Sequence, residues 1–152
     1  MEDNLILLLK QLNISLDQYS RSQMKRLPHA DLSPSQGFVL DYLFSQRGGI
    51  VYATDLHEKF QISKAAISSI LKDLKQKGYL EMAANPEDDR KKQLLLTPKA
   101  YAVHEEIDAF LLAQQRQLCR GIPPQHLAII AAGLRTMIAN VRQHPQGAIL
   151  HG

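Results

Sequence analysis

The segment from residue 63 to 77 places hydroxyl groups and lysines on one side of a predicted helix. At about 100° per residue, its apolar side chains form one stripe, made of Ile67, Ile70, Leu71 and Leu74. The opposite side is short or cationic, and its candidate contact residues are Ser63, Lys64, Ala65, Ser68, Ser69, Lys72 and Lys75. Serine hydroxyls can donate or accept at nucleobase edges, an alanine methyl can contact a thymine methyl, and lysines reach guanine edges or phosphates. This pattern predicts a helix that can enter a nucleic-acid groove.

The ends of this helix have their own candidate roles. Ser63 is expected to cap the helix and, with free backbone N–H groups, to lie where a phosphate would bind. Lys75 and Lys77 are closer to the flank and suit phosphates rather than bases. For Lys77 a solubilising surface lysine is an equally good interpretation.

The neighbouring segments predict the fold that presents this helix. A short helix at 54–60 precedes it, and two strands at 79–82 and 92–96 follow it around a charged loop. A short helix, a tight turn, a second helix and a hairpin form a winged helix-turn-helix, in which the second helix lies in the DNA major groove. Further helices are predicted at 4–26, 33–48, 97–120 and 125–143, where Ser33-Pro34 and Thr97-Pro98 provide start signals. The predicted fold class is mainly α with a small β-hairpin wing.

The first and last predicted helices share a coiled-coil-like spacing of apolar residues. Both carry more apolar side chains than a one-sided surface helix needs, which favours a helical dimer interface over packing within one chain. The candidate dimerisation residues are Leu5, Leu9, Leu12, Leu16, Leu127, Ile130, Leu134, Met137 and Val141.

Residues 55–80 (DLHEKFQISKAAISSILKDLKQKGYL) and 85–100 (NPEDDRKKQLLLTPKA) together resemble the core of the MarR family of bacterial multiple-antibiotic-resistance-type regulators. The resemblance implies one domain over 1–152, with a DNA-binding lobe at about 33–98 and a helical dimerisation region at about 1–27 and 99–145. It also implies that Arg90 enters the minor groove, where negative potential favours arginine, and that Asp88 orients its guanidinium. Lys91 and Lys92 complete the wing candidates.

Three positions depart from the family pattern. Asp89 stands where a second arginine is usual, which reduces the positive charge of the wing tip. Ala100 and Gln61 stand where glycine is usual, after the wing and in the helix-turn-helix turn respectively.

The composition of the chain limits which partners and which cellular compartment are expected. The chain has 152 residues, 45% hydrophobic content, a formal charge of +3 and a pI near 9.0, which permits a polyanionic partner without requiring one. A single cysteine, Cys119, and an acidic start without a secretory signal favour the cytoplasm. No apolar run approaches the roughly 20 residues that cross a bilayer, so no membrane contact is expected.

Other kinds of site have little support in the sequence. The six histidines lack metal-ligand spacing, and His104 with Glu105 and Glu106 is the only cluster that merits a metal titration. No phosphate-binding glycine loop or nucleophile motif is present, so neither an enzyme nor a cofactor is expected. The resemblance implies a small lipophilic or phenolic effector, for which Tyr19, Met24, Phe38 and Tyr42 are candidate pocket residues, although core packing explains such side chains more often. Cys119 is expected to behave as a small hydrophobe rather than as a redox sensor.

Two hypotheses follow. The first is a homodimeric, cytoplasmic transcriptional regulator, acting as a repressor, that binds a pseudo-palindromic duplex site and is released by a small effector. The alternative is a winged-helix protein-interaction module without sequence-specific DNA binding, which Asp89 and the modest net charge would suit. The operator, the regulated genes, the effector and the sign of regulation do not follow from the sequence.

Overall fold

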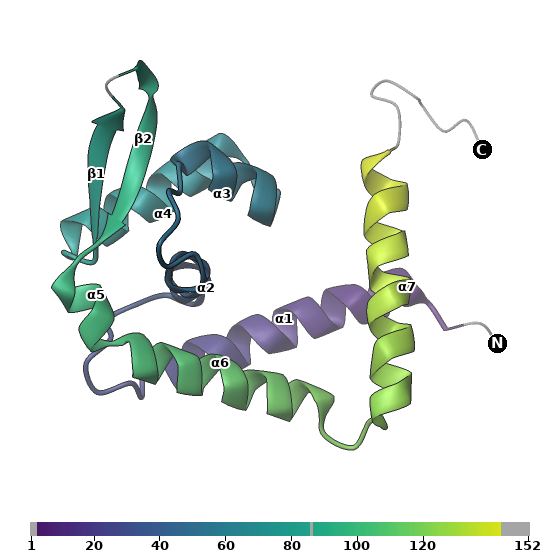
Figure 1. The fold of residues 1–152 in the computed structure, drawn as a ribbon. Coiled ribbons are helices and arrows are strands. Elements are labelled where there is room, and N and C mark those ends of the chain that lie inside the picture. Colours follow the sequence, from purple (N-terminus) through teal and green to yellow (C-terminus); the bar gives the residue numbers. More distant parts are fainter. Residues whose placement is uncertain (1–2, 86, 144–152) are drawn as a thin grey trace. The chain divides into compact units, whose positions relative to one another are not determined.

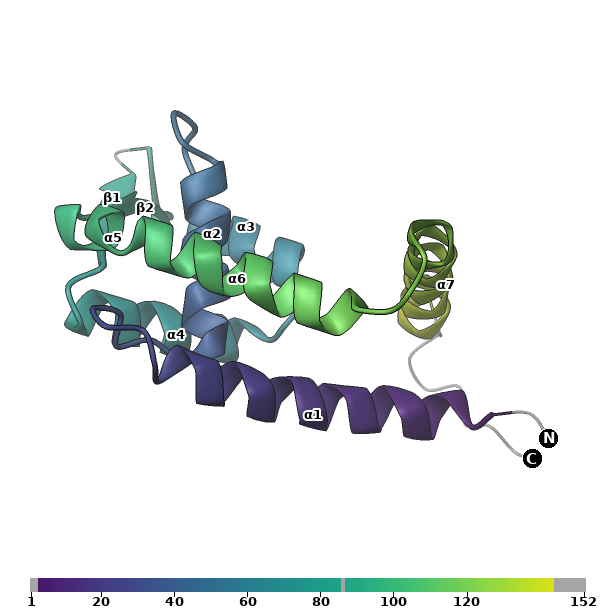
Figure 2. The same ribbon diagram turned by 90° about the horizontal axis from the view of Figure 1, so that it is seen from below.

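The computed structural model describes residues 3–85 and 87–143 (Figures 1 and 2). The chain divides into two compact units, Met1–Gln114 and Gln115–Gly152. In order, the elements are α1 (Leu5–Met24), α2 (Pro34–Ser45), α3 (Ala53–Phe60), α4 (Lys64–Gln76), β1 (Leu80–Asn85), β2 (Asp88–Leu96), α5 (Pro98–Ala102), α6 (His104–Cys119) and α7 (Pro124–Arg142). The predicted class, mainly α with a β-hairpin, is confirmed. The predicted division into one domain with two regions stays a prediction, and residues 144 and 145 of its dimerisation region lie outside the described residues.

The predicted helix starts are confirmed by their hydrogen bonds. Ser33 and Gln36 form a capping box at the start of α2, in which each side chain accepts from the other residue's backbone N–H. Ser63 Oγ accepts from the Ala66 N–H at 3.1 Å, and the Thr97 hydroxyl caps α5 in the same way. Gly78 follows α4 with a φ of +85°, a conformation that glycine adopts at little cost. These local signals set where the helices of the lobe begin and end.

The hairpin is longer than predicted. Strand pairing runs from Leu80 opposite Leu96 to Ala84 opposite Lys92, and an irregularity then brings Asn85 opposite Asp88. The added residues are small, polar or charged, so they lacked the alternating apolar pattern by which strands are recognised. In Figure 1 the hairpin extends beyond the helices of the lobe.

The helix predicted from 97 to 120 is wrong in one respect, because it is broken at Val103. The backbone there (φ −103°, ψ 4°) leaves helical geometry and separates α5 from α6. Nothing in the local sequence is a helix breaker. Val103 is buried, and the neighbouring Tyr101 ring lies 6.0 Å from that of Phe44, so tertiary packing overrides local propensity here.

The core of the first unit is formed by apolar side chains from the end of α1 to α6. Its most completely buried members are Tyr79, Leu40, Leu56, Leu74, Leu80, Ile107 and Val39. Within it, α2 contacts both α1 and α4, and α3 contacts α4 and β2. A Cβ atom on Gly37 would lie 2.6 Å from Met24 Cε, so glycine at this position allows α1 and α2 to approach closely. This core fixes α4 and the hairpin relative to α2.

The second unit contains α7 and has no comparable core. None of the residues of α7 is buried, and Ile129 and Val141 are 70% and 77% exposed. A helix of this apolar content needs a covering surface to be stable in water.

Candidate nucleic-acid interface

The side of α4 predicted to face a ligand is exposed. We call it the outer face of α4, and its residues are Lys64, Ala65, Ser68, Ser69, Lys72, Lys75 and Gln76. On the opposite side Ile67, Leu71 and Leu74 are buried in the core, and Ile70 is partly buried against it. The predicted division of the helix into an apolar stripe and a short, cationic face is therefore confirmed. Exposure alone does not establish what the outer face binds.

The turn that leads into α4 is held without glycine. Gln61 adopts a left-handed φ of +54°, which is sterically costly for a residue with a Cβ. His57 Nδ1–H donates to the Ile62 carbonyl oxygen at 2.5 Å. This bond joins α3 to the residue just before the Ser63 cap. His57 was not identified as a positioning residue from the sequence, because its partner is a backbone atom five residues away.

The C-terminal end of α4 is tied to the segment between α1 and α2. Lys77 Nζ donates to the Asp31 carbonyl oxygen at 2.7 Å and to Gln36 Oε1 at 3.0 Å. Gln36 is buried, and its Nε2 lies 3.5 Å from Asp73 Oδ2. Lys77 therefore does not point away into solvent, as either sequence interpretation supposed. Its role in the structure is to hold the recognition-type helix against α2.

Tyr79 and Asp31 extend this network. The Tyr79 hydroxyl donates to the Asp31 carboxylate, which lowers the pKa of Asp31 below its usual value. Burial of the phenol, followed by this same hydrogen bond, raises the pKa of Tyr79 to about 12. At neutral pH the pair is thus a carboxylate and a neutral phenol. Lys99 Nζ lies 4.5 Å from the centre of the Tyr79 ring and donates to the Lys77 carbonyl oxygen.

The wing presents its predicted cations. Arg90, Lys91 and Lys92 are all exposed. Asp88 Oδ1 accepts from the Arg90 backbone N–H at 3.0 Å, whereas no ion pair between the two side chains occurs among the described residues. The expectation that Asp88 orients the guanidinium is corrected: its carboxylate shapes the turn, because two residues is the natural span of an Asx turn.

Tyr52 positions the base of the wing and was missed by the sequence analysis. It forms a bridge with Gln93 of β2, and its hydroxyl accepts from Asn85 Nδ2 at 3.4 Å. Lys91 Nζ lies 5.6 Å from the centre of its ring, a cation–π distance. The Leu94 N–H also donates to the Val51 carbonyl oxygen at 2.8 Å. Residues 51 and 52 thus attach the hairpin to the start of α3, and only three-dimensional proximity reveals this.

The candidate dimerisation residues lie on α1 and α7. Leu5, Leu9, Leu12, Ile130 and Val141 are exposed, and Leu16, Leu127, Leu134 and Met137 are partly exposed. The Leu5 side chain, for example, is 54% exposed. A partner that covers them is not part of the structure, so their role remains a prediction.

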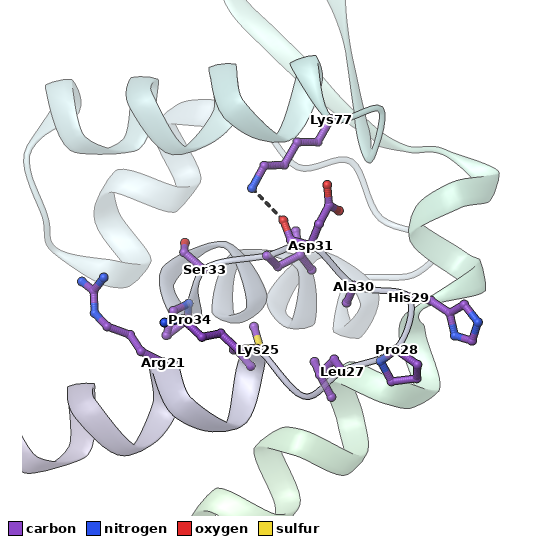
Figure 3. A pocket seen from close by; sticks show the side chains of 12 residues that line it. Arg21, Lys25, Leu27, Pro28, His29, Ala30, Asp31, Ser33, Pro34 and Lys77 are labelled. Atoms are coloured by element: carbon purple, nitrogen blue, oxygen red, sulfur yellow. Dashed lines mark hydrogen bonds between the residues drawn. The ribbon is translucent and has the colours of Figure 1, made fainter.

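The four candidate effector residues do not share one cavity. Met24 belongs to the core, and Tyr42 packs edge-on against Phe60 with ring centres 5.9 Å apart. Tyr19 lines a cavity of about 330 Å³ between α1 and α6, and Phe38 lines a separate one of about 140 Å³. A larger cavity of about 640 Å³ lies elsewhere, between the end of α1 and Lys77 (Figure 3).

Three histidines of the described ranges, His29, His57 and His104, have side-chain hydrogen-bonding or packing roles. His29 Nδ1 lies 2.6 Å from Glu106 Oε1, and His104 stacks on Phe44 while its Nε2 lies 3.3 Å from Asp108 Oδ2. Across residues 3–85 and 87–143, no group of three or more His, Cys, Asp or Glu side chains could hold a metal ion. His144 and His151 lie outside the described residues.

The Asp41 carboxyl group, near His104 and Asp108, has a shifted pKa. Burial raises the pKa of Asp41 on α2, and the nearby Asp108 carboxyl on α6 adds to the rise, while His104 opposes it. As to membranes, none of the helices in the described part of the chain is long and apolar enough to span a bilayer.

Comparisons with known proteins agree with this geometry. Residues 30–91 match the sequence profile of the MarR family. The transcription regulator MarR from Oenococcus oeni PSU-1 shares 25% identity, with a TM-score of 0.76 over 90% of this chain and 99% of that one. MepR from S. aureus, in a complex with DNA, has a TM-score of 0.83 and 18% identity over 91% of this chain and 99% of that one. A mutant MarR from E. coli, in a complex with operator DNA, has a TM-score of 0.76 and 20% identity over 88% of this chain and 92% of that one.

No sequence among the curated proteins matches this chain. The profile match covers the helix-turn-helix and most of the wing, and the structural likeness extends over nearly the whole chain. Two of the three departures from the family pattern are accommodated locally: Gln61 adopts the left-handed turn, and the Ala100 methyl is fully buried. Residues 30–91 thus match the MarR family in sequence, and about 90% of the chain shares the fold of the MarR-type structures.

Proposed function

We propose that this chain is a DNA-binding transcriptional regulator in which the outer face of α4 lies in the major groove. The observation that carries this proposal is the exposure of a short, hydroxyl-rich and cationic surface on the second helix of a winged helix-turn-helix. A helix that presented long acidic side chains would collide with base edges and repel phosphates, whereas this one can approach closely. Two structurally similar proteins, MepR and a mutant MarR, have been solved with DNA.

The wing supplies the second contact in this proposal. Arg90 enters the adjacent minor groove, and Lys91 and Lys92 neutralise phosphates. Tyr52 holds the base of the hairpin, so the cations of the wing are presented at a defined distance from α4. The side chain of Asp89 lies outside what the structure describes.

We further propose that two copies associate through α1 and α7. The uncovered apolar side chains of both helices support this, because a second copy would bury them on each side of a twofold axis. Two α4 helices would then read half-sites about one helical turn apart, roughly 34 Å. A bound dimer would repress by blocking polymerase, and an effector that favours a dimer with the wrong spacing would release the DNA.

The match of residues 30–91 to a family of transcription regulators supports the prediction that the chain is not an enzyme. The remaining alternative is a winged-helix module that binds a protein instead of DNA. The low net charge of +3 is the observation that favours it.

Gel-shift titration of selected duplexes at several salt concentrations separates the two. Sites are first enriched from a random DNA pool with the intact protein. A DNA-binding regulator gives an affinity that falls by about 0.9 log units per log unit of salt for each phosphate neutralised. If no duplex is enriched, or if binding does not respond to salt, the regulator proposal is wrong and the protein-interaction module is favoured.

A further inference from the structure

The outer face of α4 carries methyl, hydroxyl, ammonium and carboxamide groups, but neither arginine nor an acidic side chain. Arginine binds the guanine edge in a bidentate manner, and a carboxylate accepts from the cytosine amino group. Asp73 is the acid of this helix, and its Oδ2 instead lies 3.5 Å from Nε2 of the buried Gln36 on α2. The face therefore has few groups with which to select a G·C pair.

The first turn of α4 places a methyl group where base contacts are expected. Lys64 and Ala65 follow the Ser63 cap, whose Oγ accepts from the Ala66 N–H at 3.1 Å. The first N–H groups of a helix have no intrahelical partners, and the positive end of the helix dipole favours a phosphate there. In helix-turn-helix proteins the N-terminal residues of the recognition helix contact base edges. Ala65 is therefore in the part of α4 that comes closest to the bases.

Two serines lie beside Ala65 on the same face. Ser68 and Ser69 are three and four residues further along the helix, which brings their Cβ atoms about 5–6 Å from that of Ala65. All three side chains are exposed. Side chains this short leave room for a group that projects into the major groove, and among the four bases that apolar group is the thymine C5-methyl.

We propose that the outer face of α4 recognises thymine through its C5-methyl group, which packs against the Ala65 methyl between Ser68 and Ser69. The serine hydroxyls donate to or accept from either base of the same A·T pair. Lys64 and Lys72 flank this contact and bind phosphates or guanine edges, so they add affinity with less discrimination. The inference rests on the proposed function and names the base group that its site reads.

The same contact makes DNA binding sensitive to methylation of cytosine. In 5-methylcytosine the methyl group is attached to C5 and projects into the major groove, as it does in thymine. A cytosine opposite Ala65 would therefore be bound more tightly when it is methylated. Removing one methyl group from water in this contact should change the affinity by about fourfold for each half-site.

Sites enriched from a random DNA pool with the intact protein supply the duplex for the test. Each thymine of one half-site is replaced in turn by uracil, which removes only the methyl group, and the dissociation constant is measured by fluorescence anisotropy. At least one of these replacements should weaken binding by about fourfold. At that position 5-methylcytosine should be bound about fourfold more tightly than cytosine.

Ala65→Gly removes the protein methyl group that the contact needs. In this variant, thymine and uracil at the sensitive position should give dissociation constants within about twofold of each other. Ala66→Gly is the matched control, because it makes the same substitution in the same turn at a half-buried position that is not on the outer face. Both glycines weaken the helix to a similar extent, so the control should keep the fourfold ratio of the parent protein.

The inference is overturned if no thymine of the site is bound more tightly than uracil, or if Ala65→Gly keeps the ratio of the parent. Loss of the ratio in Ala66→Gly as well would also overturn it, because the effect would then belong to the start of the helix and not to the Ala65 methyl. Salt-dependent DNA binding without this ratio refutes methyl recognition and leaves the proposed function standing. If the parent protein binds no duplex, the proposed function fails and this inference fails with it.

Discussion

The winged lobe and the two long helices α1 and α7 differ in the exposure of their large apolar side chains. In the lobe, from α2 to β2, large apolar side chains such as Leu40, Leu56 and Leu74 are completely buried, and the surface helix α4 shows solvent a polar, cationic face. On α1 most of the large apolar side chains are exposed or partly exposed, apart from Met24 at its end, and none of the residues of α7 is buried. Helices are present in both regions, so helix propensity does not explain the difference in exposure.

The contrast indicates that the apolar side chains of the lobe are buried within one chain, whereas those of α1 and α7 need another surface to cover them. The lobe packs on a core that is completed within the same chain by α5, α6 and Met24 at the end of α1, and this core holds α4 in place. The exposed apolar residues of α1 and α7 lower the free energy only when another surface covers them. Substitutions in the two regions should therefore separate association, stability and DNA binding.

The largest effect is expected from charges placed on the exposed apolar side of α1. Leu9→Asp combined with Leu12→Asp would put four carboxylates into a twofold interface, each at a cost of several kcal/mol. The dimer dissociation constant should rise by at least about 10³-fold, as measured by sedimentation velocity. Lys10→Gln with Asn13→Asp makes the same charge change on the polar side of α1 and should leave association intact. Equal dissociation by both pairs would remove α1 from the interface.

Truncation in the lobe core comes next. Leu74→Ala removes a side chain that is 0% exposed and should lower the free energy of unfolding by about 2–5 kcal/mol in chemical denaturation. Ile129→Ala, tested in the Leu9→Asp and Leu12→Asp background, should cost less than about 0.5 kcal/mol because nothing covers it there. Similar losses at both sites would contradict the contrast between the regions.

A third substitution tests the polar face of the lobe. Lys72→Ala should weaken binding to a selected duplex by about 1–3 kcal/mol through a lost base or phosphate contact, measured by fluorescence anisotropy. Its association state should not change, unlike that of the α1 variant. Lys10→Ala is the matched control on α1. A loss of the same size in the control would mean that overall charge, rather than α4, determines the affinity.

A smaller effect is expected at Gln61. Glycine relieves the left-handed strain but increases the entropy of the unfolded chain, so Gln61→Gly should raise the free energy of unfolding by about 0.5 kcal/mol. Thermal unfolding of the two proteins compares them directly. A destabilised variant would show that the Gln61 side chain makes a contact worth more than the strain.

The last prediction concerns Asp41 on α2, which faces Asp108 and His104 of α6. Its pKa is raised in the folded state, so the folded chain holds the proton more tightly and loses stability as pH rises through that raised pKa. Asp41→Asn should therefore raise the Tm at pH 7, and the difference should vanish as pH falls below the ordinary aspartate value of 3.8. A difference that is independent of pH would mean that packing rather than charge separates the two proteins.

The sequence predicted those parts of the molecule that depend on local patterns. The Ser33, Ser63 and Thr97 caps and the apolar stripe of α4 are readable at spacings of three and four residues, and all are confirmed. The outer residues of the two wing strands and the break at Val103 were missed. The first lacks an apolar pattern, and the second is imposed by packing against α2.

The contacts that position the candidate site were less accessible to prediction. Lys77 meets Asp31 across 46 residues, and Tyr52 meets Asn85 across 33. Such pairs carry no periodic signal in a single sequence. For this reason the composition of the outer face was predictable, whereas the network behind it, and the cavity beside Lys77, were not.

Tethered DNA cleavage shows whether the outer face of α4 lies against base edges. Gln76→Cys, in a Cys119→Ser background, carries an iron chelate at the exposed end of that face. If α4 lies in the major groove of each half-site, a selected duplex should be cleaved in two clusters about one helical turn apart, roughly 10 base pairs. The same chelate at Thr136→Cys on α7 should give no such clusters. Absent cleavage from position 76, or the same pattern from both positions, would contradict the account.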